Sequence, residues 1–86
     1  MSTSDLFNNG LDSISNELRI QIDMSWSISE KLSKILEEKN MTQKDLAKLV
    51  GKRESEVCRW LGGTHNFTLK TIAKISSVLD VDLIKV

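Results

Sequence analysis

Hydrophobic residues recur at three- and four-residue intervals over most of this chain, which is the period of an amphipathic α-helix. One apolar stripe begins at Ile28 and predicts a helix over residues 28–39, and Asn40 is a suitable residue to end it. The side chains that we expect this helix to bury are Ile28, Leu32, Ile35 and Leu36.

The segment before this helix, residues 18–28, fits two kinds of structure. Its even positions from Ile20 to Ile28 are all apolar and alternate with other residues, which is typical of a strand. Leu18, Ile22 and Trp26 instead follow helical spacing, and this pattern continues into the next helix without a break. We therefore favour a helix here and expect Trp26 in the core.

The N-terminal residues also carry a weak helical pattern. Ser4 and Asp5 are good capping residues for a short helix. The apolar residues that follow them at helical spacing are Leu6, Phe7, Leu11 and Ile14.

Two short helices in the middle of the chain are bounded by capping residues. Thr42 is a good N-cap for a helix over Gln43–Val50, and Asp45 completes the Thr-x-x-acid capping signature. Gly51 ends that helix, because glycine adopts the left-handed backbone most easily. A second helix is predicted over Glu54–Leu61, stopped by the glycines at 62 and 63.

A last helix is predicted over Leu69–Leu79, with Thr68 as its N-cap. The side chains expected on its buried face are Leu69, Ile72, Ile75, Val78 and Leu79. Residues 81–86 alternate in polarity, so a short strand and an adhesive terminus both remain open.

Composition narrows the class of protein. Eighty-six residues with 28% charged and 40% apolar residues and no proline suit one small helical domain. A single cysteine, Cys58, excludes an internal disulfide and a cysteine-based zinc site, and one histidine leaves no third member for a catalytic triad. We expect no enzyme, cofactor or metal. The polar start and the lack of a long apolar run predict a cytoplasmic protein without a membrane segment.

Charge is distributed unevenly although the net charge is zero. Residues 1–39 hold four basic and seven acidic residues, a net charge of −3, whereas residues 40–86 hold eight basic and five acidic residues, a net charge of +3. A basic region in the second half suggests contact with a polyanion.

The two short helices and the turn between them have the spacing of a helix-turn-helix motif. Ala47 has to be small because the second helix crosses closely over it, Gly51 makes the turn, and Val57 and Trp60 fill the space between the helices. The residues that fall at the expected offsets are Thr42, Gln43, Ala47, Gly51, Val57 and Trp60.

On these residues, and on the run MTQKDLAKLVGKRESEVCRWLGGTHNFTLKTIAKISSVLDV, the chain resembles the Cro/C1-type helix-turn-helix repressors. Within that family, WLGGTHNFTLKTIAKI is most similar to small HigA-like antitoxins. The resemblance implies an all-α, compact, lambda-repressor-like DNA-binding domain of four to five helices over residues 28–81. Residues 1–27 would then be an N-terminal helical extension. Residues 82–86 would be a short tail, which is extended if the strand alternative given above applies.

The resemblance also implies which residues contact double-stranded DNA. The helix over residues 54–61 would lie in the major groove, and the residues placed to read bases are Glu54, Ser55, Cys58 and Arg59. Those placed to hold phosphates are Gln43, Lys44, Lys52, Arg53, Thr64, His65 and Asn66. This chain departs from the family where Arg53 replaces the usual Ser or Thr cap, and Glu54 and Glu56 oppose a polyanion.

Two functions follow as hypotheses. The first is a sequence-specific repressor that binds a palindromic operator as a homodimer, because one module of this size contacts too few bases to select a site. The second is an antitoxin whose acidic residues 1–39 bind a basic toxin protein, with DNA binding used for autoregulation.

Overall fold

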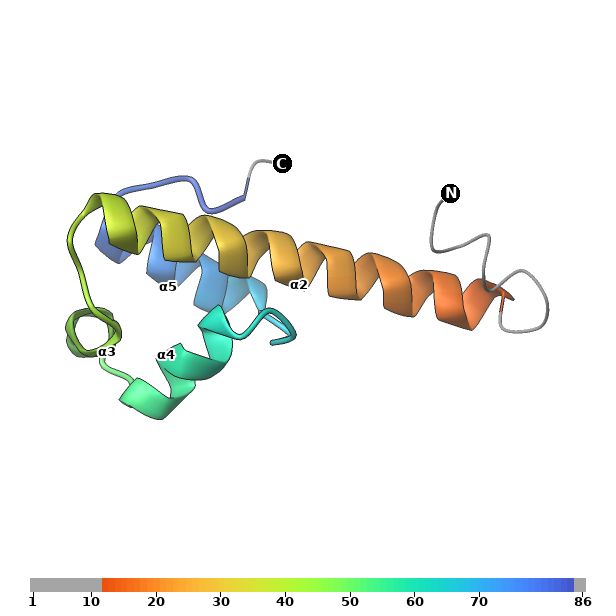
Figure 1. The fold of residues 1–86 in the computed structure, drawn as a ribbon, viewed down its shortest axis with the longest axis horizontal. Helices are drawn as coiled ribbons and strands as arrows, with labels where there is room; N and C mark the ends of the chain where they lie inside the picture. The colour runs from red at the N-terminus through yellow and green to blue at the C-terminus, as the bar shows by residue number, and fades with distance from the viewer. Residues whose placement is uncertain (1–11, 85–86) are drawn as a thin grey trace.

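The structure is a computed structural model that describes residues 12–84, with side chains from residue 15 onwards. Within this range every regular element is a helix: α2 (Asp12–Glu38), α3 (Gln43–Val50), α4 (Glu54–Leu61) and α5 (Leu69–Leu79) (Figure 1). The prediction of an all-α fold is confirmed. The short helix expected behind Ser4 and Asp5 lies outside the described residues, as do the last two residues of the tail.

The longest element, α2, runs without interruption for 27 residues, which is about 40 Å at the usual helical rise. The helical interpretation of residues 18–28 is therefore correct, and the strand alternative is wrong. The helix ends where expected, because Asn40 adopts a left-handed φ of 54° and the Met41 N–H donates to the Leu36 carbonyl at 2.9 Å.

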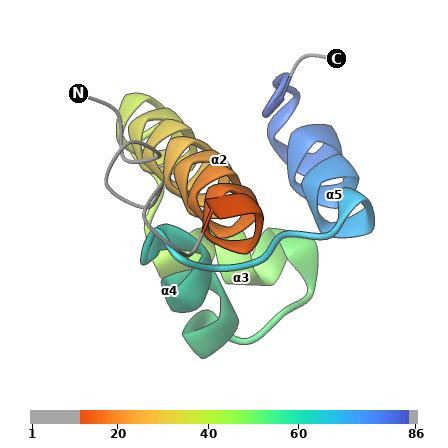
Figure 2. The same ribbon diagram turned by 90° about the vertical axis from the view of Figure 1, so that its right-hand side faces the viewer.

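The core lies beneath the C-terminal half of α2, where α3, α4 and α5 pack together (Figures 1 and 2). The N-terminal half of α2 extends past the ends of α4 and α5 (Figure 1). The buried apolar side chains are Ile28, Leu32, Ile35, Leu36, Leu46, Ala47, Val50, Val57, Trp60, Ile72, Ile75, Leu79 and Leu83. The predicted buried stripe of residues 28–36 is thus confirmed.

Two predicted core residues are exposed. Trp26 has 58% of its surface exposed, although its ring lies against Gly63, just after the end of α4. Leu69 is 76% exposed, because it is the first residue of α5 and lies at the margin of the core. Both predictions were wrong, and Val78 is only half-buried.

The segment after α5 folds back onto the core. Asp80 ends α5 with a left-handed φ of 53°, and the Val81 N–H donates to the Ser76 carbonyl at 3.0 Å. The Leu83 side chain is buried, and its N–H donates to Ser76 Oγ at 3.3 Å. Residues 81–84 form no strand.

No helix within the described residues is both long enough and apolar enough to cross a membrane.

Candidate nucleic-acid interface

The start of α3 is fixed by a reciprocal capping box. The Asp45 N–H donates to Thr42 Oγ1 at 3.1 Å, and the Thr42 N–H donates to Asp45 Oδ2 at 3.0 Å. The backbone hydrogen bond from Thr42, with a smaller contribution from its hydroxyl, lowers the pKa of Asp45 below its ordinary value of 3.8. The capping signature predicted from the sequence is confirmed, and it orients the first turn of α3, where Gln43 and Lys44 lie.

The turn between α3 and α4 depends on Gly51. Its φ of 70° is left-handed, and the Lys52 N–H closes the end of α3 by donating to the Ala47 carbonyl at 3.0 Å. A Cβ at Gly51 would meet no other atom within 4 Å, so the constraint there is the backbone angle and not space. Ala47 is buried, and α3 and α4 pack against each other, as the motif requires.

Helix α4 is held on its inner side by apolar packing and one buried hydrogen bond. Val57 and Trp60 are both buried against the core. The hydroxyl of Ser29, itself buried in α2, donates to the Trp60 carbonyl at 2.5 Å. These contacts fix α4 relative to both α3 and α2.

The outer side of α4 carries the four side chains predicted to read bases. Glu54, Ser55, Cys58 and Arg59 are all exposed, and their spacing places them on one face of the helix. Because the opposite face is locked into the core, these side chains are presented outward by a rigid element.

The N-terminus of α4 lacks a side-chain cap. Arg53 has extended backbone angles, φ −76° and ψ 148°, which suit an N-cap residue, but its side chain makes no capping hydrogen bond. The negative charges of Glu54 and Glu56 in the first turn interact favourably with the positive end of the helix dipole. With Arg53 in place of the usual Ser or Thr cap, the start of α4 is therefore stabilised by acidic residues and not by a capping side chain.

The predicted phosphate-binding residues fall into two groups. Lys44, Lys52 and Arg53 are exposed at the start of α3 and in the turn before α4, and Gln43 is half-buried beside them. The loop residues differ among themselves. Thr64 is exposed, whereas the His65 ring packs edge-on against Phe67 with centroids 4.8 Å apart.

Asn66 is the outlier of the predicted set. It lines a groove between α2 and α5 whose other lining residues include Ile20, Met24 and Leu69. The sequence placed it with the phosphate-binding loop; it is exposed, and its neighbours in the groove are mainly apolar.

Two basic residues that the sequence interpretation did not assign lie beside the turn. Lys70 and Lys74 of α5 line a cleft of about 280 Å³ together with Lys52, Trp60 and Thr71. Their four-residue spacing on α5 was visible in the sequence, but their approach to Lys52 depends on how α5 packs on α3. Three lysines around one cleft widen the basic surface beyond the motif itself.

Across residues 12–84, no group of three or more His, Cys, Asp or Glu side chains is arranged to hold an ion. Cys58 is a free thiol on the exposed side of α4.

Comparison with known proteins identifies the motif independently. A family model described as a Cro/C1-type HTH DNA-binding domain matches residues 31–84, which include α3, α4 and α5 in full. No curated protein and no solved structure matches the chain significantly, and the narrower similarity to HigA-like antitoxins has no support from these comparisons.

Proposed function

Because this chain belongs to the Cro/C1-type helix-turn-helix DNA-binding family, we propose that it is a cytoplasmic transcriptional repressor that reads operator sequence with α4. The proposal rests on one observation: the inner face of α4 packs into the core, whereas its outer face is exposed. Val57 and Trp60 are buried, while Ser55 and Arg59 are exposed. An Arg in this position suits bidentate hydrogen bonding to guanine O6 and N7 in the major groove.

Phosphate contacts would position α4 in the groove. The basic side chains available around the motif are Lys44, Lys52, Arg53, Lys70 and Lys74. Glu54 and Glu56 oppose them at the approaching end of α4, so we infer that non-specific binding is weak and that affinity relies on base contacts.

Dimerisation is part of the proposal. One helix of eight residues contacts only a few base pairs, which is too little to select one site from a genome. Two copies related by a two-fold axis would bind two half-sites about 34–36 Å apart, or a multiple of that distance.

Selection of binding sites from random duplex oligonucleotides tests the proposal. The expected result is enrichment of one palindromic sequence, bound more tightly than scrambled duplex by a factor of about 10³ or more at fixed salt. Equal recovery of all sequences would refute sequence-specific regulation. Lys48→Ala is the matched charge control for Lys44→Ala, because Lys48 lies in the last turn of α3 and none of the proposed DNA contacts uses it.

A second candidate function is neutralisation of a toxin protein. Two observations favour it: residues 1–39 carry a net charge of −3, and Leu18 and Ile22 in this region are exposed apolar residues. The antitoxin would bind a basic partner there and use α4 for autoregulation.

The test of this candidate uses the product of a small basic reading frame adjoining the gene. Co-expression of the full chain should rescue growth from that product, and the double variant Leu18→Glu, Ile22→Glu should not rescue while keeping its DNA affinity. Absence of such a reading frame, or a product that causes no growth arrest, would exclude this function.

A further inference from the structure

An apolar groove of about 350 Å³ lies between the N-terminal half of α2 and the start of α5. Its walls include Ile20 and Met24 from α2, Phe67 from the loop, and Leu69 and Ile84 from α5 and the tail. Ile20 is 44% exposed and Met24 is 59% exposed. A groove with exposed apolar walls is suited to contact with another apolar surface.

Charged residues lie at both ends of an apolar stripe on α2: Glu17 lines the groove, and Lys31 lies beyond it. Glu17, Ile20, Met24 and Lys31 are separated by three, four and seven residues, so they follow one stripe along the helix. Glu17 and Lys31 are both exposed, with an acid at one end of the stripe and a base at the other. Such a stripe is complementary to a second copy of itself only when the two helices run antiparallel.

We propose that this stripe and groove form the homodimer interface, in which two α2 helices pack antiparallel across a two-fold axis beside Met24. Each Glu17 then lies near the partner's Lys31, and Ile20 and Met24 of each copy cover the apolar groove of the other. The inference rests on the proposed dimeric function and specifies the surface that serves it. A two-fold interface is self-complementary by symmetry, as this stripe is.

The position of the groove keeps the DNA-reading helix open. Viewed along α2, α5 lies on one side of this helix, and α3 and α4 lie beneath it (Figure 2). A copy seated in the groove between α2 and α5 therefore does not cover α4. A two-fold axis that runs from α2 toward α3 reverses α2 and leaves both α4 helices on the same side of the dimer.

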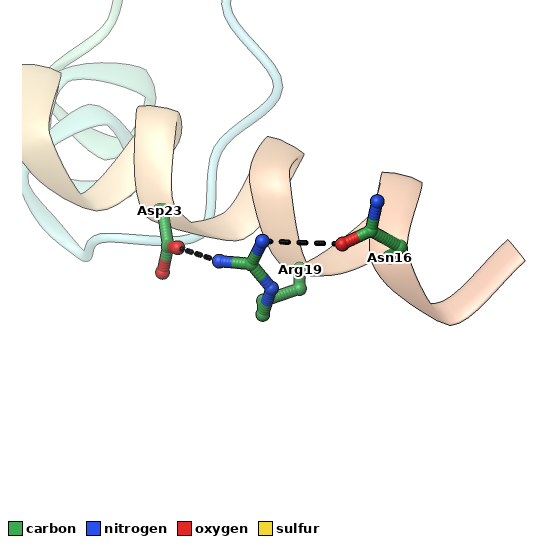
Figure 3. Close-up of polar contacts among 3 residues, drawn as sticks. All are labelled: Asn16, Arg19 and Asp23. Atoms are coloured by element: carbon green, nitrogen blue, oxygen red, sulfur yellow. Dashed lines mark hydrogen bonds and ion pairs between the residues drawn. The ribbon is translucent and has the colours of Figure 1, made fainter. Parts of the chain in front are cut away.

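The other faces of α2 are less suitable for this partner. Arg19 donates to Asp23 at 3.0 Å and to Asn16 at 3.1 Å, so one face is polar and already internally paired (Figure 3). The flank with Leu18 and Trp26 is apolar, but Trp26 packs on Gly63, next to the end of α4. A copy bound on that flank would crowd the DNA-reading element.

The test compares Met24→Glu with Leu18→Glu, which is a matched control because Leu18 is a similarly exposed apolar residue on a different flank of α2. Light scattering and analytical ultracentrifugation measure the dimer dissociation constant without DNA, and circular dichroism checks that both variants stay folded. We expect Met24→Glu to raise the dissociation constant at least about 100-fold, because each dimer would bury two charges, and Leu18→Glu to change it less than about 3-fold.

Cross-linking locates the axis directly. In a Cys58→Ser background, Met24→Cys should form an intermolecular disulfide on oxidation, because a residue beside the two-fold axis approaches its own copy closely enough. Leu18→Cys should not. A wild-type protein that is monomeric, or cross-linking and dissociation governed by Leu18 and not by Met24, would overturn the inference.

These outcomes are separable from the proposed function. If the site selection returns one palindrome but Met24→Glu leaves the dimer intact, the interface is wrong and sequence-specific binding stands. If Met24→Glu dissociates the dimer but no sequence is enriched, the interface stands and the proposed function fails.

Discussion

Replacement of Gly63 by alanine tests how the end of α4 is joined to α2. Gly63 is buried and has a φ of 95°, a backbone angle that residues with a Cβ rarely adopt. A methyl group there would lie 2.3 Å from Cε3 and 2.6 Å from Cζ3 of Trp26. The substitution therefore carries a backbone cost and a steric cost that have different origins.

The two costs are of similar size. A left-handed backbone at a residue with a Cβ costs about 1–2 kcal/mol, and forcing extra volume against a packed ring costs about 1–3 kcal/mol. Trp26 is more than half exposed, so its ring can rotate away and the steric cost should fall at the low end. We expect Gly63→Ala to lower the free energy of unfolding by about 2–3 kcal/mol, a large share of the total for a chain of this size.

A double-mutant cycle with Trp26→Ala separates the two costs. Urea unfolding followed by circular dichroism gives the free energy of unfolding for all four proteins. In the Trp26→Ala background, Gly63→Ala should cost only the backbone share of about 1–2 kcal/mol. An equal cost in both backgrounds would refute the contact between the ring and Gly63, and no cost in either would refute the left-handed backbone.

Three further outcomes are expected. Ionised Asp45 stabilises α3, and because its pKa is lowered, this contribution is present above the ordinary pKa of 3.8 and is lost as pH falls through the lower folded value. Asp45→Asn should therefore show a shallower loss of stability in acid urea titrations, and an unchanged slope would contradict the capping role. Arg53→Ser should raise the free energy of unfolding by about 1 kcal/mol, because serine adds an N-cap to α4. The same substitution should weaken DNA binding, because a positive charge is lost. Stability and DNA affinity measured on one sample should therefore change in opposite directions. Lys70→Ala and Lys74→Ala should each reduce the slope of log binding constant against log salt by about one if these side chains contact phosphates, and an unchanged slope would remove α5 from the interface.

Local capping chemistry explains why the short helices were predictable. The observed bounds of α3, α4 and α5 coincide with the predicted ones. Thr42 and Thr68 make the expected N-cap hydrogen bonds, and Gly51 has the expected left-handed backbone. Each of these signals depends on residues within four positions along the chain, so no knowledge of tertiary packing was needed.

The wrong predictions of burial concern residues near the ends of the neighbouring elements. Helical periodicity shows which face of a helix is apolar, but it does not show where the covering helix ends. Trp26 and Leu69 lie on the expected stripes but are exposed: Trp26 contacts the chain at Gly63, just after the end of α4, and Leu69 is the first residue of α5. The cleft that joins Lys70 and Lys74 to Lys52 was missed for the related reason that it depends on the packing of α5.

Base reading by α4 is tested most directly by comparing Arg59→Ala with Lys44→Ala on the selected operator and on duplexes with single base changes. We expect Arg59→Ala to lose about 1–3 kcal/mol of binding free energy on the operator and to lose discrimination at one base position. Lys44→Ala should weaken binding to every sequence alike and reduce the salt slope by about one. If Arg59→Ala instead weakens binding to all sequences equally, α4 does not read bases through Arg59.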